Sequence, residues 1–424
     1  MTTQQSNATN RNEFHSDLCR AIVAANIPFN TLENSQFKSF LEKYCHRSIP
    51  SESTLRKNYL HTLYEETLSG VREDIGDSYI WISVDETTDR LGRCVANLIV
   101  GKLDPDAPSV PHLICSKELK KTNQETVAHF VNNALKTLYL NNLDENKVLI
   151  IYTDAASYMI AAAKLLKVFY PALLHITCLA HAMNRVAETI RLEYPQVNKL
   201  VSTIKKVFIK APTRIQLFRE ELPNIPLPPE PILTRWGTWL QAVEYYSKHL
   251  EDIKNIVLKL GEDAVSITSA KELLQDPTIA HDIAFIKSHY VFLVPTINAL
   301  ESSGKPVYKQ LGLIEEVTEK INLVPGYVGE KVSEKLKSML QKNPGLTVLR
   351  TVADILSGKK PEHECAVPLR LIPTFKYAPV TSVDVERSFS AYKMVLSDKR
   401  CSFSMENLEK VVVVYCDSNY GHVQ

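Results

Sequence analysis

The sequence predicts an α/β fold: a mixed β-sheet with flanking helices, interrupted by a long helical segment and closed by C-terminal helices. Three observations indicate this class. Strand-like apolar runs with short connectors fill residues 79–116. Helical and strand-like patterns then alternate over 124–210, which is typical of a sheet covered by helices. From about residue 241 the pattern is almost wholly helical for a hundred residues.

The first 77 residues precede the predicted sheet. Residues 1–12 are polar, and we expect them to form a disordered tail. Over 13–77 apolar residues recur at every third or fourth position, as an amphipathic helix requires. Leu18 and Ile22 mark a first helix, Phe37 and Leu41 mark a second, and a third is expected to start near Ser51.

The sheet itself is predicted to begin at Tyr79. Segments 79–84, 93–102 and 110–116 are expected to pair as a three-stranded antiparallel meander, because their connectors are short. A helix over 124–140, a strand over 147–152, a helix over 155–169, a strand over 173–177 and a helix over 178–210 follow. We therefore assign residues 78–240 to the first part of the sheet domain.

The second half of the chain is predicted to interrupt and then complete this domain. Prolines between positions 223 and 231 mark a stiff surface segment that is neither helix nor central strand. Residues 241–370 are expected to form a helical insertion, and residues 371–424 to supply the last helices of the sheet domain.

Composition limits the classes of function. With 49 basic and 48 acidic residues the net charge is +1, which argues against tight DNA binding by this chain alone. The eight cysteines are scattered without a CxxC pair, so neither a zinc finger nor a zinc ribbon can be assembled. The apolar runs are too short to span a bilayer, and the first residues lack the apolar core of a signal peptide. A reducing compartment is therefore the default expectation.

Three acidic residues occupy positions that suit a metal site. Asp85 follows the first predicted strand, Asp154 follows the fourth, and Glu386 lies on a helix far downstream. Carboxylates brought together from strand ends and a packed helix form a hard oxygen site of the kind that Mg²⁺ prefers. Each acid also has a simpler interpretation: Asp85 could close a turn, Asp154 could cap the helix predicted at 155, and Glu386 could be a solvated helix position.

The helix around Glu386 has its own signals. Thr381 and Asp384 form a pair that resembles a capping box, which places the helix start just after Pro379. Glu386 stands at the edge of the predicted buried face, where a carboxylate requires a partner. Arg387, Lys393 or a metal ion could supply it. The apolar stripe of this helix consists of Val385, Phe389, Tyr392 and Leu396.

Five short blocks, taken in order, resemble the signature blocks of hAT transposases. They are DETTD at 85–89, TDAAS at 153–157, CLAH at 178–181, TRWG at 234–237 and ERSFS at 386–390. The resemblance covers about 14–419 and, over 14–63, points to the subgroup related to the CGG-triplet-repeat-binding protein. It implies an RNase H-like catalytic domain with a helical insertion, in which Asp85, Asp154 and Glu386 are the catalytic, metal-binding acids.

The resemblance also implies roles in DNA binding for three further residues. Trp236 would stack on a base flipped out at the cleavage site, which is how aromatic faces hold unstacked bases. Arg235 would pair with a catalytic acid, and His181 would sit near the scissile phosphate. The residues alone leave simpler interpretations open: Trp236 could be buried between the sheet and the insertion, and His181 could be a satisfied structural histidine.

The C-terminal segment carries an apolar stripe. Its members are Leu408, Val411, Val412 and Tyr415. The resemblance implies a dimerisation helix here and thus a homo-oligomer, whereas packing into the core of a single chain would explain the same pattern. The run of valines is also compatible with a strand.

Together these observations predict a transposase-like core that cleaves DNA and transfers strands with two Mg²⁺ or Mn²⁺ ions, without zinc. Water and then a DNA 3′-hydroxyl would attack phosphorus in line. The resemblance implies a nuclear location and DNA as partner. The BED-type finger usual in this family has no matching Cys/His set in this sequence, so we expect site recognition to be missing or supplied elsewhere. The alternatives are a non-enzymatic, transposon-derived dimerising nuclear protein that acts through partners, and a general RNase H-like nuclease.

Overall fold

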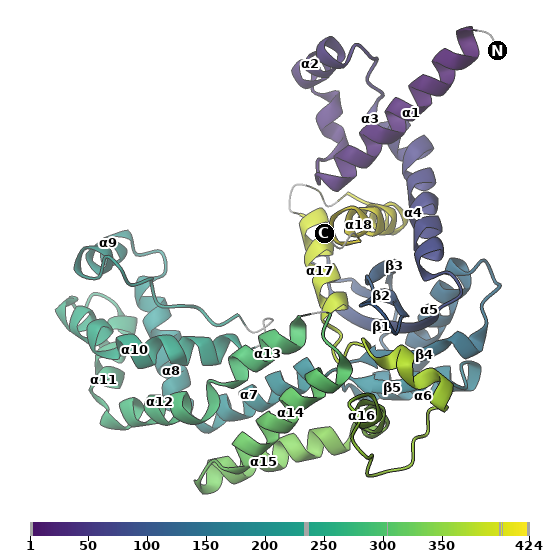
Figure 1. Ribbon diagram of the computed structural model, residues 1–424. Coiled ribbons are helices and arrows are strands. Elements are labelled where there is room, and N and C mark those ends of the chain that lie inside the picture. Colours follow the sequence, from purple (N-terminus) through teal and green to yellow (C-terminus); the bar gives the residue numbers. More distant parts are fainter. Residues whose placement is uncertain (1–2, 233–236, 303, 398–399, 401, 422–424) are drawn as a thin grey trace. The chain divides into compact units, whose positions relative to one another are not determined.

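The computed structural model describes residues 3–232, 237–302, 304–397, 400 and 402–421 (Figure 1). The chain forms two compact units. The first combines Met1–Thr177 with Glu364–Gln424, and the second is the intervening Cys178–His363. The sheet lies in the first unit, so its helical partners come from both ends of the chain.

Five strands make one mixed sheet in the order β3-β2-β1-β4-β5. They are β1 Tyr79–Thr88, β2 Cys94–Leu103, β3 His112–Glu118, β4 Val148–Thr153 and β5 Leu174–Thr177. β1, β2 and β3 pair antiparallel, while β4 pairs parallel to β1 and β5 parallel to β4. The expected meander and mixed sheet are therefore confirmed, with the first strand extending four residues beyond its predicted end at Val84.

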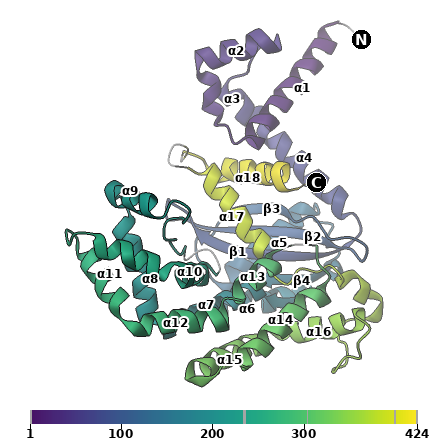
Figure 2. The same cartoon turned by 60° about the vertical axis from the view of Figure 1, so that its left-hand side comes forward.

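The central strands are apolar because helices cover both faces of the sheet. Every residue of β4 is buried, as are Ile80, Ile82 and Val84 of β1. Helix α17 (Val383–Val395) packs on β1 and β2, and α6 (Ser157–Phe169) packs on β4 and β5. Figure 2 shows α17 lying across β1 and β2. Strands buried on both faces are typical of parallel pairing.

The N-terminal part of the first unit is helical, as predicted. Its elements are α1 Thr3–Ala24, the 3₁₀ turn Phe29–Glu33, α2 Ser35–Cys45, α3 Glu52–Thr54, the π-helical turn Leu55–Tyr59 and α4 Leu60–Ile75. Ser51 caps α3 through its hydroxyl, which accepts a hydrogen bond from the Thr54 amide. α1 begins at Thr3, within the segment 1–12 that the sequence predicts as a tail.

The C-terminal helix α18 (Met405–Tyr420) packs on β3 and on α4. The stripe predicted for dimerisation is buried in this single chain: Leu408 and Val412 are fully covered, and Val411 and Tyr415 are 1% and 8% exposed. A stripe already covered by β3 and α4 does not require a second subunit, so this apolar pattern no longer argues for dimerisation. The segment is helix rather than strand.

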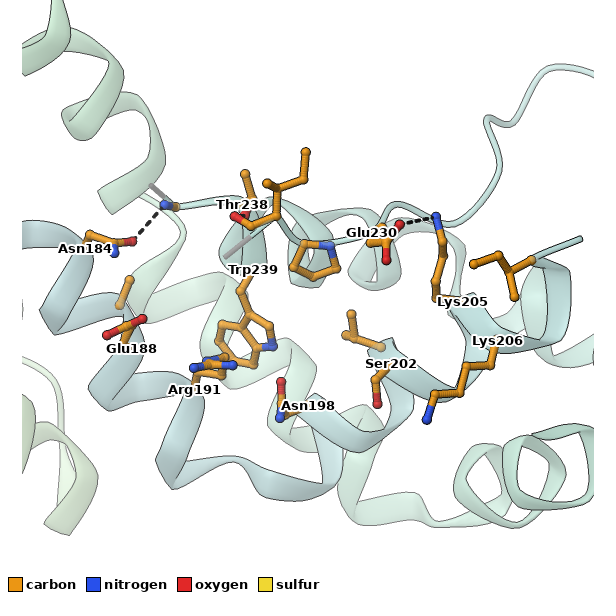
Figure 3. A pocket seen from close by; sticks show the side chains of 16 residues that line it. Asn184, Glu188, Arg191, Asn198, Ser202, Lys205, Lys206, Glu230, Thr238 and Trp239 are labelled. Atoms are coloured by element: carbon orange, nitrogen blue, oxygen red, sulfur yellow. Dashed lines mark hydrogen bonds and ion pairs between the residues drawn. The ribbon is translucent and has the colours of Figure 1, made fainter. Parts of the chain in front are cut away.

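The second unit is helical throughout its described residues. It contains α7 Leu179–Glu193, α8 Pro195–Phe208, α9 Pro212–Glu221, α10 Thr238–Lys259, α11 Val265–Gln275, α12 Pro277–Tyr290, α13 Leu293–Glu301, α14 Val307–Asn322, α15 Gly326–Gln341 and α16 Pro344–Leu356. Helices α7, α8 and α10 contribute to a pocket in this unit (Figure 3).

The helical unit begins earlier than the predicted insertion at 241–370. The helix expected over 178–210 is broken at Tyr194, because the following Pro195 starts a new helix at its first position. Its two halves pack on other helices of the second unit, α7 on α13 and α15 and α8 on α11. Both halves therefore belong to the helical unit.

No single helix among the described residues is long and apolar enough to cross a membrane. The pair α12 and α13 reaches the required length only when joined, and it is bent by 42°. Ile283, Ile286 and Ile297 of this pair are buried in the second unit.

Candidate active site

The parallel pairing of β1 and β4 brings two of the predicted acids to neighbouring positions. Asp85 lies within β1 rather than after it, because the strand continues to Thr88. Ser83 pairs with Tyr152 in the parallel register, so Asp85 and Asp154 each lie two residues further along neighbouring strands. Such strands run about 4.8 Å apart. Asp85 is buried, with 7% of its surface exposed, and Asp154 is half-buried.

Asp154 also has a local structural role. One of its carboxylate oxygens accepts a hydrogen bond from the Ala156 amide at 2.9 Å. This bond closes the turn after β4, and α6 begins only at Ser157, with Ala156 as its N-cap residue. The predicted helix start at 155 is therefore wrong by two residues, and Asp154 stabilises the turn before the helix.

Glu386 lies in the first turn of α17, on the same side of the sheet as Asp85. The capping box predicted before it does not form: Ser382 is the N-cap residue, and no side chain caps the helix. Asp384 instead accepts a bond from Arg387 at 2.9 Å. Burial raises the pKa of Asp384, and the guanidinium of Arg387 opposes that rise.

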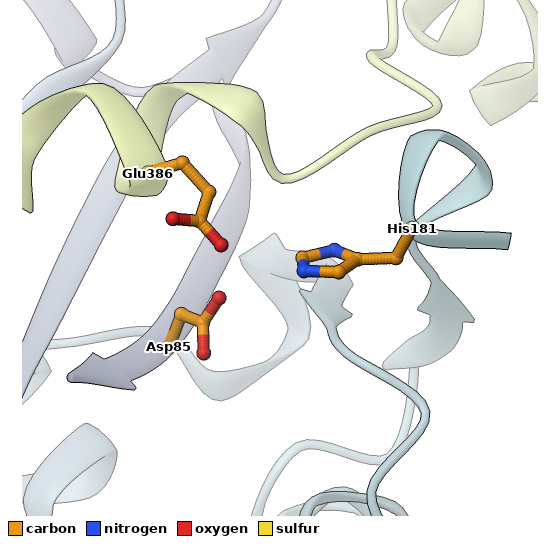
Figure 4. Close-up of side chains that lie close together, drawn as sticks. All are labelled: Asp85, His181 and Glu386. Atoms are coloured by element: carbon orange, nitrogen blue, oxygen red, sulfur yellow. The ribbon is translucent and has the colours of Figure 1, made fainter. Parts of the chain in front are cut away.

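Asp85 and Glu386 come together in the fold although they are far apart in the sequence. One carboxylate oxygen of each lies within 4.8 Å of the other. Figure 4 shows the two side chains directed toward each other, one from β1 and one from α17. Asp154 does not join this close group in the part of the chain that the structure describes.

The donor set fits a hard divalent cation. Two oxygens bound to one Mg²⁺ at about 2.0–2.1 Å lie at most about 4.2 Å apart. A small side-chain movement would therefore allow Asp85 and Glu386 to share an ion, because their oxygens are within 4.8 Å. Asp154 is the nearest strand-end carboxylate that the strand register offers as a further ligand.

A buried hydrogen bond fixes the helix that carries Glu386. The Asn97 side-chain amide donates to the Ser388 hydroxyl at 2.7 Å. Asn97 lies on β2 directly opposite Asp85 in the antiparallel register, and Ser388 lies two residues after Glu386. Both partners are almost completely buried. This bond, which we call the Asn97–Ser388 link, therefore ties the position of one acid to the strand pair that presents the other.

A second buried network secures the other end of α17. Asp89 accepts hydrogen bonds from the Arg93 backbone at 2.9 Å, the Arg93 side chain at 2.8 Å, the Leu91 amide at 2.8 Å and the Tyr392 hydroxyl at 3.1 Å. Burial would raise the pKa of Asp89, but these donors outweigh it and hold the pKa below its usual value. Asp89 therefore binds the β1–β2 turn to α17 as an ionised carboxylate.

A further carboxylate, Glu86, points to the opposite face of β1. Its partner is the Tyr158 hydroxyl on α6, as expected because successive strand side chains alternate. Burial raises the pKa of Glu86, the bond from Tyr158 counters it, and the negative charge of Asp154 adds to the rise. The alternation signal in the sequence could have located Glu86, whereas nothing local points to Tyr158.

The three predicted DNA-binding residues belong to the second unit, residues 178–363. His181 lies in the first turn of α7, at the start of the second unit, and Cys178 immediately before that helix is buried. Arg235 and Trp236 lie outside the described residues, so their predicted roles in DNA binding stay predictions.

Comparison with known proteins covers the first half of the chain. Residues 5–62 match the CGGBP1 helical domain. Residues 50–207 match a domain of unknown function, DUF659, which is found in hAT-like transposase-related proteins. These matches support a family related to CGGBP1 and hAT elements. No curated protein gives a significant match to the sequence.

The matched regions contain only part of the candidate site. The first covers the N-terminal helices, and the second contains Asp85, Asp154 and the Asn97 partner of the link. Glu386 and Ser388 lie beyond both regions, so only the fold connects them to the strand-end acids.

Proposed function

We propose that this chain is an hAT-type catalytic core that cleaves DNA phosphodiester bonds and transfers strands with the help of Mg²⁺ or Mn²⁺. The observation that carries the proposal is the approach of the Asp85 carboxylate on β1 and the Glu386 carboxylate on α17 to within 4.8 Å. The position of Asp154 at the end of the adjacent parallel strand supports it. An RNase H-like classification is part of the proposal and is supported by the mixed sheet with helices on both faces.

The chain's own residues would perform binding and orientation. Asp85, Glu386 and Asp154 would hold two ions, whose chemistry is to neutralise phosphate charge and to lower the pKa of bound water. The Asn97–Ser388 link and the Asp89 network keep Glu386 in place without rearrangement during the reaction. Preorganised charge of this kind is a main source of rate enhancement in phosphoryl transfer.

DNA as substrate, a homo-oligomeric state and a nuclear location belong to the same proposal, because the resemblance to hAT transposases implies them. The near-neutral charge of +1 argues that binding by the chain alone is weak and salt-sensitive. Trp236, Arg235 and His181 are the proposed DNA contacts.

The test combines metal binding with strand cleavage. Full-length protein is titrated with Mn²⁺ by calorimetry and incubated with supercoiled plasmid in Mg²⁺, in Mn²⁺ or with a chelator. Asp85→Asn and Glu386→Gln should each abolish nicking and weaken Mn²⁺ binding by at least tenfold. Glu65→Gln, which changes an exposed acid on α4, should behave as wild type.

Two outcomes would contradict the enzymatic proposal. Unchanged Mn²⁺ affinity in both acid variants would show that the pair does not bind metal. Normal metal binding without nicking, on plasmid and on oligonucleotides with hAT-type ends, would favour the alternative: a non-enzymatic, transposon-derived nuclear protein that acts through partners.

A further inference from the structure

The second unit contains a pocket that the proposed catalytic site does not use. It has a volume of about 430 Å³, within the usual range for small-molecule sites. Helices α7 and α8 and the start of α10 form its walls, together with the segment around Pro231 and Ile232 (Figure 3). Because all lining residues lie in residues 178–363, the pocket is independent of the Asp85–Glu386 pair.

One wall of the pocket is apolar but includes a hydrogen-bond donor. Val201, Ile232 and Trp239 supply apolar surface. Trp239 is only 7% exposed, and its indole Nε1 has no hydrogen-bond acceptor among the described residues. Buried indole N–H groups normally find an acceptor. A ligand that places an acceptor atom beside Nε1 would supply it.

Cationic side chains also line the pocket. Lys205 is held by Glu230 at 2.8 Å, and Glu188 is the other carboxylate of the lining. Arg191 and Lys206 form no ion pair within the described part of the chain. Figure 3 shows Arg191 next to the Trp239 indole and Lys206 further along the rim, beyond Ser202. The unpaired guanidinium beside the indole matches the oxygens of a phosphate, and the unpaired ammonium adds positive charge further along the pocket.

We propose that this pocket binds a nucleoside phosphate. The base would lie against the apolar wall with a ring nitrogen or carbonyl accepting from Trp239 Nε1. The phosphate would bind Arg191, and Lys206 would add positive charge further along the pocket. Two sources could supply this chemistry: a free nucleotide, or an unpaired nucleotide within a DNA strand. Both sources offer a planar ring with a hydrogen-bond acceptor joined to an anion. The Trp239 Nε1 donor and the cationic side chains of the pocket complement these two features.

The experiment measures binding of a fluorescent adenosine monophosphate analogue to the full chain by anisotropy. Competitors are unlabelled adenosine monophosphate, adenosine, inorganic phosphate and a short single-stranded oligonucleotide. Arg191→Gln should weaken binding about tenfold or more, because it removes a charge-assisted contact. Lys206→Gln should weaken it less, because Lys206 lies further along the pocket. Trp239→Phe, which removes the N–H and keeps an aromatic ring, should weaken it while circular dichroism stays unchanged.

Lys199→Gln is the matched control, because Lys199 is an exposed lysine of α8 that does not line the pocket. It should bind the probe as wild type does. Asp85→Asn should do the same, because Asp85 belongs to the proposed catalytic site and not to this pocket. Competition by the mononucleotide alone indicates a free ligand, and stronger competition by the oligonucleotide indicates a strand. The proposal is overturned if Lys199→Gln weakens binding as much as Arg191→Gln, if phosphate competes as well as the nucleotide, or if millimolar probe does not bind.

Discussion

Asp85 and Asn97 face each other across the β1–β2 pair, and between them they determine where Glu386 lies. Asp85 presents its carboxylate toward Glu386, while Asn97 holds Ser388 one half-turn further along α17. A shift of one residue in this register would turn both side chains to the other face of the sheet. The candidate site therefore depends on the strand register as much as on the acids themselves.

The effect of the Asn97–Ser388 link on metal binding can be separated from its effect on stability. Asn97→Ala should cost about 1–3 kcal/mol of unfolding free energy, because a buried hydrogen bond is lost. It should also weaken Mn²⁺ binding, since Glu386 loses its fixed position. Asn132→Ala removes the acceptor of the Tyr170 hydroxyl elsewhere in the first unit and serves as control.

The control should lose similar stability and keep the metal affinity of wild type. Calorimetric titration of the two variants, each confirmed as folded by circular dichroism, makes the comparison. Equal Mn²⁺ affinity in both would show that the link is structural only.

Glu409 is a buried carboxylate on α18 that makes stability depend on pH. It accepts bonds from the Cys115 thiol at 3.1 Å and the Ser116 amide at 3.3 Å. Burial raises its pKa, and Lys117 and these donors only partly offset the rise. A glutamate side chain in the unfolded protein has a pKa of about 4.3. Between that pH and the higher pKa of the folded protein, the folded state binds more protons, so stability falls as pH rises.

Glu409→Gln should remove this fall in stability with rising pH while keeping an acceptor for the Ser116 amide. We expect the variant to gain stability over wild type as pH rises from about 4.5 to 7, measured by urea unfolding at each pH. Glu406→Gln is the control. The bond from Lys410 lowers the pKa of Glu406, so the contribution of this residue to stability rises with pH instead of falling. Parallel wild-type and Glu409→Gln curves would refute the assignment.

The acids of the site could be predicted from the sequence, but the residues that hold them could not. Asp85 and Asp154 end apolar runs that any strand pattern reveals. The Asn97–Ser388 link joins positions 291 apart, and neither residue type is distinctive. The capping box failed for a related reason. Thr381 is buried at 3% exposure, so packing rather than local hydrogen bonding determines how α17 begins.

At the scale of elements, the strand pair β1–β2 has a second constraint besides its acids. Gly101 pairs with Trp81, and a Cβ at position 101 would lie 2.5 Å from the Trp81 ring. The ring is 97% buried by its surroundings and its Nε1 donates to the Ser109 hydroxyl at 2.9 Å, so it cannot move aside freely. Glycine is therefore required here by the tryptophan across the strand pair.

Gly101→Ala should destabilise the protein by about 1–3 kcal/mol, the usual cost of overpacking a core. Gly70→Ala is the matched control, because Gly70 is exposed within α4 and nothing lies within 4 Å of its added Cβ. In a helix that change should stabilise by about 0.5–1 kcal/mol. Thermal unfolding of both variants makes the comparison, and a neutral Gly101→Ala would contradict the predicted clash.

Element positions were predictable wherever the pattern was long and periodic. The strands and the helix at Gln124–Leu138 lie within a few residues of their predicted ends. The helix expected over 178–210 is in fact two helices, because Pro195 starts a second one. A proline at the first helical position is also compatible with a new start, and only the packing of α7 and α8 distinguishes the two.

At the scale of the whole molecule, the first unit is built from two distant parts of the sequence. The mixed sheet and the helical character of the second half follow from sequence patterns. The border of the second unit at Cys178 does not, because the periodicity of α7 and α8 is the same whether a helix packs on a sheet or on other helices. The same ambiguity affected α18, whose stripe suits a dimer and a monomeric core equally well.

Substitutions in α18 should therefore unfold the first unit rather than separate subunits. Leu408→Asp places a charge in a fully buried position against β3 and α4, and we expect a loss of more than about 3 kcal/mol. Lys410→Asp, two residues further along at the partly exposed side of the helix, should have a much smaller effect. Circular dichroism and light scattering together distinguish unfolding from dissociation. A folded Leu408→Asp monomer would restore the dimer interpretation.

The division of the first unit has a consequence for its synthesis. When β1 to β5 have left the ribosome, the roughly 190 residues of 178–363 must still be translated before α17 and α18 follow. At about 5–20 residues per second this interval lasts on the order of 10–40 s. During that time β3 and the β1–β2 face have no cover, and Asp85 has no Glu386 beside it. The nascent chain therefore exposes apolar surface until its last sixty residues arrive, which gives a ribosome-bound chaperone a defined surface and a defined interval in which to bind.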